Sequence, residues 1–155
     1  MIWLDNLFQR LYRLGYPLAL FYCRLIKCSS HVVQVAFWVK GSVLLVKNSY
    51  RDGYSLPGGD VKKGEGSFEA ACRELVEETG VEFIPDDLTL AMNIHYTSYG
   101  LKFHAEIFEC RAEEAPAVQV DNREVVEALF FKPQDALDLS LSKSVRKYLR
   151  KKALG

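Results

Sequence analysis

The segment from Ser67 to Thr79 constrains the fold most, because its pattern predicts a helix with two unlike faces. At about 100° per residue, one face gathers side chains that can pack on a sheet. These side chains are Phe68, Ala71, Cys72, Leu75 and Thr79. A second face, about 100° wide, carries Glu74, Glu77 and Glu78 at spacings of three and four residues. Such a helix needs an apolar layer on one side and positive charge on the other.

Three carboxylates this close repel one another. In water each like-charged pair costs a few tenths of a kcal/mol, and the cost grows where the site is partly desolvated. A hard divalent cation with oxygen ligands answers this charge best, and Mg²⁺ is the leading candidate. Arg73 adds one positive charge, which can pair with Glu77 four residues on or reach back to Glu65. An isolated E-x-x-E-E pattern is usually a solvated surface. The residues that flank the helix are therefore needed to distinguish a ligand site from an ordinary surface.

The flanks of this helix favour a ligand site over an ordinary surface. Leu56-Pro57-Gly58-Gly59 precedes the helix, and adjacent glycines let the backbone approach a ligand closely. The carbonyl of Gly59 can then supply a further metal oxygen. Ser67 is placed as an N-cap and Gly80 as a C-cap, so we expect a helix fixed at both ends.

The whole segment from Gly59 to Val81 resembles the Nudix box, G-x5-E-x7-R-E-U-x-E-E-x-G-U with U aliphatic. Every fixed position matches: Gly59, Glu65, Arg73, Glu74, Leu75, Glu77, Glu78, Gly80 and Val81. Tyr54 stands where many members have Trp. The resemblance extends over residues 31–152, and the N-terminal arm lies outside it.

The resemblance implies a fold, a reaction and a set of ligands. The fold is an α/β class, a Nudix-type α/β/α sandwich with a mixed β-sheet. The reaction is hydrolysis of a nucleoside diphosphate linked to another group, by water attack on phosphorus. Mg²⁺ or Mn²⁺ would be bound by Glu74, Glu77, Glu78 and the Gly59 carbonyl. Arg73 and Glu65 would hold the loop and helix in place.

The general base has several candidates. Glu74 is one, and Asp121, Glu124 and Glu127 are others, because D-N-R-E-V-V-E stands just before an expected strand ending at Phe131. That position resembles the place from which many members bring an extra metal-binding glutamate. We favour Glu124 as a base or ligand, which makes the expected catalytic set Glu74, Glu77, Arg73 and Glu124.

The rest of the chain predicts one mixed domain. The length of 155 residues fits a single domain, which we place at residues 30–155. Strands are expected at 32–39, 42–47, 88–96, 101–110 and 125–131, with the third and fourth forming a hairpin around Tyr99-Gly100. A functional loop is expected from Asn48 to Gly66. A helical turn at Pro133 and a basic, solvated helix over 141–152 complete the chain.

Residues 1–29 predict an amphipathic helical extension, with Gly15 and Pro17 breaking it into two helices. The clean apolar run is too short for a membrane span, and no cleavage site follows it. We expect the arm to pack on the domain or on a second subunit as a homodimer. Weak contact with a membrane surface is the alternative, since basic residues lie opposite the apolar face.

Substrate choice is less constrained. Lys47 and Arg51 lie close to the box in sequence and are the candidates for substrate phosphate binding. Four aromatic residues, Phe37, Trp38, Tyr96 and Phe103, can stack a base but are more often core. His95 and His104 fall in expected strands, where a histidine is usually just hydrogen-bonded. An oxidised purine triphosphate, ADP-ribose, a nucleotide sugar and a dinucleoside polyphosphate all stay open.

Charge and cysteines narrow the context. Twenty basic and twenty acidic residues balance, so no global field favours nucleic acid, and no DNA partner is expected. The four cysteines follow no zinc pattern, and we expect reduced thiols in the cytoplasm. Two rivals stay in view: a nucleotide sensor without activity, which retained box carboxylates disfavour, and an enzyme acting on the 5′ end of RNA.

Overall fold

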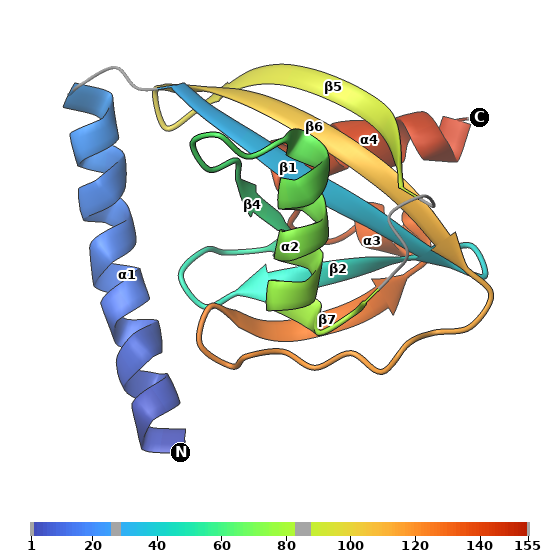
Figure 1. Cartoon of the computed structure of the whole chain (residues 1–155), viewed down its shortest axis with the longest axis horizontal. Helices are drawn as coiled ribbons and strands as arrows, with labels where there is room; N and C mark the ends of the chain where they lie inside the picture. Colours follow the sequence, from blue (N-terminus) through green and yellow to red (C-terminus); the bar gives the residue numbers. More distant parts are fainter. Residues whose placement is uncertain (1, 26–28, 83–87, 155) are drawn as a thin grey trace.

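The computed structural model describes residues 2–25, 29–82 and 88–154. Its elements follow the order helix, four strands, helix, three strands and two helices (Figure 1). The helices are α1 (Ile2–Leu25), α2 (Ser67–Thr79), α3 (Pro133–Leu137) and α4 (Lys143–Leu154). The strands are β1 (Ser29–Val39), β2 (Ser42–Asn48), β3 (Tyr54–Ser55), β4 (Gly58–Asp60), β5 (Thr89–Ser98), β6 (Leu101–Ala112) and β7 (Val125–Phe131).

The strands form one mixed sheet in the order β3-β2-β1-β6-β5, with β7 paired to β2 and β4 paired to β1. The long pair β1–β6 is parallel, from Ser29 opposite Lys102 to Val39 opposite Ala112, and the other pairs are antiparallel. The predicted β5–β6 hairpin is confirmed, with Tyr99 and Gly100 at positive φ in its turn.

Helices cover both faces of this sheet, which confirms the predicted α/β/α sandwich (Figure 1). Side chains of β1 alternate between the two layers, as a strand buried on both faces requires. Val33, Val35 and Phe37 pack toward α2, whereas Ala36 and Trp38 pack toward α4. β1 is therefore the central strand of the domain.

The predicted cap at the start of α2 needs correction. The hydroxyl of Ser67 does not cap the helix: the N-cap is Gly66, without a side-chain hydrogen bond, and Ser67 is the first helical residue. Its hydroxyl instead bonds the carboxylate of Glu106, so a tertiary partner has replaced the local one. The predicted C-cap is confirmed, because Gly80 adopts the left-handed conformation and its N–H bonds the Val76 carbonyl at 2.8 Å. The loop from 48 to 66 contains the short strands β3 and β4.

The N-terminal arm is one helix, so the predicted break at Gly15 and Pro17 is wrong. A proline inside a helix removes a hydrogen bond and costs about 3 kcal/mol. Contacts with the domain lie on the same turns and offset that cost: Arg13 bonds the Ser49 carbonyl at 2.8 Å, and the Tyr16 ring contacts Tyr50 at 4.8 Å. None of the helices among the described residues combines the length and apolar character that crossing a bilayer requires.

The sulfur chemistry of the described residues is simple. Cys23, Cys72 and Cys110 form no disulfide, and Cys72 packs against the core beneath α2, as its helical position predicted. Cys28 lies outside the described residues.

Candidate active site

The Gly58-Gly59 pair forms the floor of the site, between β1 and α2. Gly58 lies so close to β1 that an added Cβ would come within 2.1 Å of the Val33 carbonyl oxygen. On Gly59, a Cβ would lie 2.7 Å from both carboxylate oxygens of Glu74. At Gly58, where the close atoms are backbone and φ is positive, only glycine allows this approach, whereas at Gly59 the flexible Glu74 side chain would have to move. The backbone at Gly59 and the carboxylate of Glu74 are therefore in immediate contact, as a shared ligand site requires.

Glu78 is the most buried carboxylate of the box, with 7% of its surface exposed. One oxygen accepts the N–H of Gly58 at 2.8 Å. Burial raises the pKa of Glu78 to about 8, with the charges of Glu124 and Glu74 acting in the same direction and Arg51 opposing them. A carboxylate in such a place is unstable as an anion unless a cation joins it.

Arg73 ties the polar face of α2 to the loop before it. Its guanidinium donates to Glu65 at 2.7 and 2.9 Å and to the Asp60 carbonyl at 3.2 Å. It also bonds Glu74 and, at 3.3 Å, Glu77. The hydrogen bond from Arg73, helped by the N–H of Lys62, lowers the pKa of Glu65 to about 2. Arg73 and Glu65 thus hold the geometry, and Arg73 also neutralises part of the carboxylate charge.

The carboxylates before β7 have three different environments. Glu124 accepts the Tyr50 hydroxyl at 2.8 Å, and its charge raises the pKa of both Glu74 and Glu78. Asp121 accepts the backbone N–H groups of residues 123–125 at 3.0–3.1 Å, so it caps its own loop. Glu127 bonds the Tyr54 hydroxyl. Of these three, Glu124 is the one whose charge reaches both box glutamates.

The donor set suits a hard divalent cation in its chemistry. Carboxylate oxygens from α2 and a backbone carbonyl from the loop are the ligands that Mg²⁺ and Mn²⁺ prefer. Burial also raises the pKa of Glu74, against the hydrogen bond from Arg73. Two largely buried carboxylates with raised pKa values leave a place for positive charge. The residues present therefore fit such an ion.

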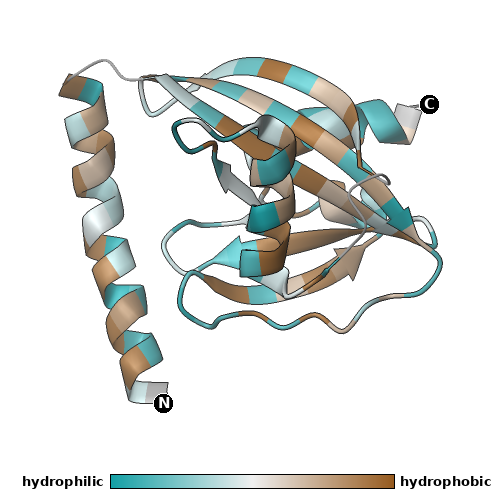
Figure 2. Ribbon diagram, viewed as in Figure 1, coloured by the Kyte–Doolittle hydropathy of each residue, from teal (hydrophilic) through white to brown (hydrophobic). Residues whose placement is uncertain are grey.

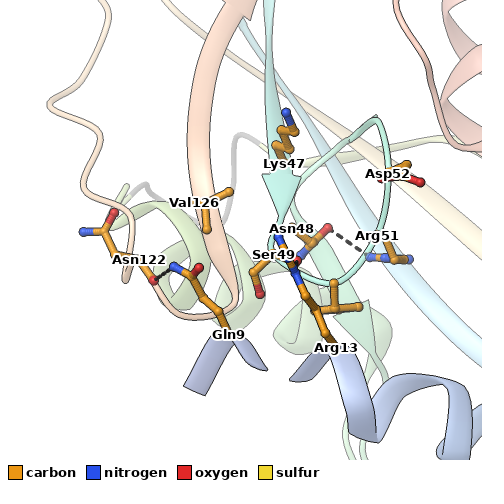
Figure 3. A pocket seen from close by; sticks show the side chains of 10 residues that line it. Gln9, Arg13, Lys47, Asn48, Ser49, Arg51, Asp52, Asn122 and Val126 are labelled. Carbon is orange, nitrogen blue, oxygen red and sulfur yellow. Dashed lines mark hydrogen bonds between the residues drawn. The ribbon is translucent and has the colours of Figure 1, made fainter. Parts of the chain in front are cut away.

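A hollow of about 780 Å³ opens beside this site, between α1 and the ends of β2 and β7 (Figure 3). Lys47 and Arg51 both line it, together with Arg13 of α1. Arg51 donates to Asn48 at 3.1 Å, and its guanidinium lies 5.2 Å from the centre of the Tyr50 ring. With Asp52 as the one acidic residue in its lining, the hollow keeps an excess of positive charge, which suits an anionic ligand.

Comparison with known proteins identifies the family. A family model described as the NUDIX domain matches residues 31–152. The chain belongs to the Nudix hydrolase family.

Similar solved structures agree on the fold. The MutT NUDIX hydrolase from Burkholderia pseudomallei superposes with a TM-score of 0.70 at 23% identity, over 79% of this chain and 97% of that one. An Ap4A hydrolase from C. elegans, solved as a binary complex, gives 0.68 at 21% identity, over 81% and 96%. The NUDIX domain of Shewanella oneidensis NrtR, complexed with ADP ribose, gives 0.70 at 18%, over 83% and 90%.

A curated relative is similar in sequence over a shorter stretch. An RNA pyrophosphohydrolase from Rhizobium meliloti (strain 1021) is 39% identical over 72 residues, which cover 40% of this chain. The match spans 43% of that relative's length. Because the match covers less than half of either chain, the substrate of that relative is not assigned to this chain.

Of the aromatic candidates for base stacking in this Nudix domain, Phe37 and Trp38 are core residues, and the Trp38 indole N–H donates to the Tyr148 hydroxyl at 2.9 Å. Tyr96 and Phe103 stack on each other at 5.2 Å across β5 and β6. The aromatic rings nearest Glu124 and Arg51 are instead Tyr50 and Tyr16. Sequence reasoning missed these two because the pairing of α1 with the loop after β2 has no local signal.

Proposed function

We propose that this Nudix domain hydrolyses the diphosphate link of a nucleoside diphosphate joined to another group. The carrying observation is the buried Glu78, whose raised pKa reflects burial beside the carboxylates of Glu74 and Glu124. A site this negative needs a divalent cation, and a cation there can meet the phosphates of an incoming substrate.

The metal ligands we propose are the carboxylates of Glu74, Glu77 and Glu78 with the carbonyl of Gly59. The ion would be Mg²⁺ or Mn²⁺, which when bound neutralises diphosphate oxygens and acidifies the attacking water. Arg73 plays a different part, because it joins α2 to the loop through Glu65 and the Asp60 carbonyl, bonds Glu74 beside it, and so holds the ligand set in register. Phosphoryl transfer asks the protein chiefly for this kind of positioning.

Glu124 is our choice for the group that takes the proton of the attacking water or completes the ligand set. The Tyr50 hydroxyl donates to one of its oxygens and leaves the other available. Burial keeps the pKa of Tyr50 far above its usual value, so this hydroxyl stays a donor. Asp121 and Glu127 are engaged by loop N–H groups and by Tyr54, which disfavours them as bases.

The substrate we favour is a small nucleotide whose outer phosphates or leaving group lie in the cationic hollow beside Lys47 and Arg51. A second candidate is the 5′ end of RNA, and the Rhizobium meliloti relative favours it. The balanced net charge argues against a long RNA footprint. A sensor without activity is the least favoured, because every box carboxylate is retained.

A substrate panel with Mg²⁺ tests this proposal. Nucleoside triphosphates, ADP-ribose, nucleotide sugars, dinucleoside polyphosphates and a 5′-triphosphorylated RNA are incubated with the full chain, and released products are quantified. We expect Mg²⁺-dependent cleavage of one small class, with RNA slower. Tight binding without turnover of any substrate would contradict the enzyme and support the sensor.

We further propose that α1 associates with a second copy of this chain. Its outward face carries apolar residues three and four residues apart, the spacing that a helical partner requires. This apolar stripe of α1 comprises Leu4, Leu7, Leu11, Leu14, Leu18, Phe21 and Leu25, all at least 40% exposed.

Deleting residues 1–29 should change oligomeric state or solubility more than metal binding. A chain that stays monomeric and binds anionic vesicles would favour a membrane surface instead. The cytoplasm stays the expected location.

A further inference from the structure

All three histidines of the chain lie side by side on one face of the sheet, although they are far apart in sequence. His31 of β1 pairs with His104 of β6, and His104 pairs with His95 of β5. Neighbouring rings stack with centres 4.5 Å apart. Strand alternation puts His31 on the face of Val33, the face that α2 covers. The sheet therefore gathers imidazoles at the edge of the α2 layer.

Glu106 completes this group. It follows His104 by two residues, so both side chains leave β6 on the same face. One of its oxygens lies 2.8 Å from Nε2 of His31. One ligand atom each from His31, His104 and Glu106 falls within 4.8 Å of the others, and no other His, Cys, Asp or Glu trio among the described residues is so close. Two ligands of a tetrahedral zinc ion lie roughly 3.3 Å apart, so small side-chain rotations suffice.

The ligand atoms are also held from behind. The Ser67 hydroxyl, at the start of α2, bonds Glu106, and a ring nitrogen of His104 lies 2.7 Å from the Asn93 side-chain oxygen. Such outer partners orient metal ligands and fix the histidine tautomer. The side chains of His31 and Glu106 are 38% and 15% exposed, so an ion can enter from solvent. The group is thus oriented and accessible.

We propose that His31, His104 and Glu106 form a second metal site, which binds a divalent transition ion, zinc first. Two imidazoles and one carboxylate favour zinc and its neighbours over Mg²⁺, which prefers oxygen ligands alone. The ion takes the place of the hydrogen bond between His31 and Glu106. Three protein ligands leave one tetrahedral position for water.

This site is separate from the box carboxylates. Ser67 contacts Glu106 at the beginning of α2, whereas Glu74 and Glu78 stand seven and eleven residues further along the same helix. At 1.5 Å per residue the separation along the axis is roughly 10 and 16 Å. A bound ion would join β1 to β6 and, through Ser67, steady the start of α2.

The test is a titration of the full chain with zinc in excess Mg²⁺, in which calorimetry measures the heat of binding. We expect one zinc ion per chain, with affinity reduced at least tenfold in His104→Ala and in Glu106→Gln. His95→Ala, which removes a stacked ring outside the trio, should change affinity less than threefold. Glu74→Gln should leave this zinc binding intact. Unchanged affinity in His104→Ala, an equal loss in His95→Ala, or loss in Glu74→Gln would each overturn the site.

A measurement on the unmodified protein guards against variants that unfold. Substoichiometric Cu²⁺ broadens NMR signals of residues near its site, and we expect the imidazole signals of His31 and His104 to broaden first. Broadening confined to residues around Glu74 and Glu78 would overturn the proposal. Mg²⁺-dependent hydrolysis, measured in parallel, reports on the box alone, so failure of one proposal is distinguishable from failure of the other.

Discussion

Two amphipathic helices, α1 and α2, use their faces in opposite ways. Helix α2 buries its apolar residues Ala70, Ala71 and Leu75 against the sheet and keeps its charged face for the active site. Helix α1 attaches to the domain through polar and aromatic side chains, and the residues of its apolar stripe are at least 40% exposed; hydrophobic colour recurs along the helix in Figure 2. Both helices have an apolar and a polar face, but only α2 buries its apolar face.

The difference teaches that amphipathicity predicts a helix without predicting which face meets the protein. On α2 the apolar face has a partner within the chain, and the polar face is strained by carboxylates. On α1 the inward contacts include a hydrogen bond from Gln9 to the Asn122 carbonyl at 2.7 Å and an ion pair of Asp5 with Arg123 at 3.1 Å. We therefore propose that the apolar face of α1 binds a partner outside the chain and that the charged face of α2 binds a cation.

The largest effect on activity should come from neutralising the strained face of α2. Glu78→Gln should lower kcat/KM by about 100-fold or more, because a lost metal ligand removes about 3 kcal/mol of transition-state stabilisation. Steady-state hydrolysis with Mg²⁺ measures this. Glu82→Gln, an exposed carboxylate just beyond α2, is the matched control and should retain activity. Equal activity of Glu78→Gln and the unmodified enzyme would show that α2 needs no cation there.

The second effect concerns the outward face of α1. Leu11→Gln with Leu18→Gln should raise the dimer dissociation constant by roughly a thousandfold, since each buried leucine contributes about 2 kcal/mol and about 1.4 kcal/mol corresponds to a factor of ten. Analytical ultracentrifugation measures the constant. Arg10→Gln, which lies beside the stripe, should leave it nearly unchanged. An unmodified chain that sediments as a monomer at every concentration contradicts the comparison.

A smaller effect should follow from the inward face of α1. Tyr16 bonds Arg51, and its ring lies 5.9 Å from the guanidinium carbon. Tyr16→Ala should raise KM about fivefold with little change in kcat, since about 1 kcal/mol of support for Arg51 is lost. Tyr22→Ala, on the exposed side of the same helix, is the control. Equal KM values for the two variants would exclude α1 from substrate binding.

A further effect, on stability and not on activity or association, is a pH dependence in the metal-free protein. The unfolded Glu78 ionises near 4.5, but burial raises its folded pKa to about 8, beside Glu74, Glu124 and Arg51. The folded state binds the proton more tightly, so the free energy of unfolding should fall as pH rises from about 4.5 to about 8. Urea unfolding in a chelator measures this fall. Glu78→Gln should flatten it, and a slope of opposite sign would contradict the burial argument.

Most of the domain could be predicted from local pattern. The helix at Ser67–Thr79 and the strand at Val125–Phe131 match to the residue. Helical periodicity between Gly66 and Gly80 defines the first, and a β-branched and aromatic run ending before Pro133 defines the second. The breaks expected at Gly15 and Pro17 were wrong, since contacts of α1 with the domain override proline's local cost. Propensity governs an element only where packing has no stronger preference.

The candidate site likewise contains residues that the sequence could name and residues that it could not. The box residues could be named from spacing because one helix and its loop carry them. Tyr50 and the His31–His104–Glu106 group could not, because strand register and the docking of α1 bring them together. The signal that existed was His104-x-Glu106, a two-residue spacing on a strand. It gains meaning only once His31 is known to lie opposite.

Strand β1 is paired on both sides: its residue Val33 lies opposite Gly59 of β4 and opposite Glu106 of β6. One backbone thus sets the alignment of the box loop and of the histidine group together. Inserting a single residue between His31 and Val33 would turn His31 to the other face while leaving Gly59 in register. We expect such a one-residue slip to abolish the proposed zinc binding and spare the proposed hydrolysis. It would thus separate two sites that are both aligned by strand β1.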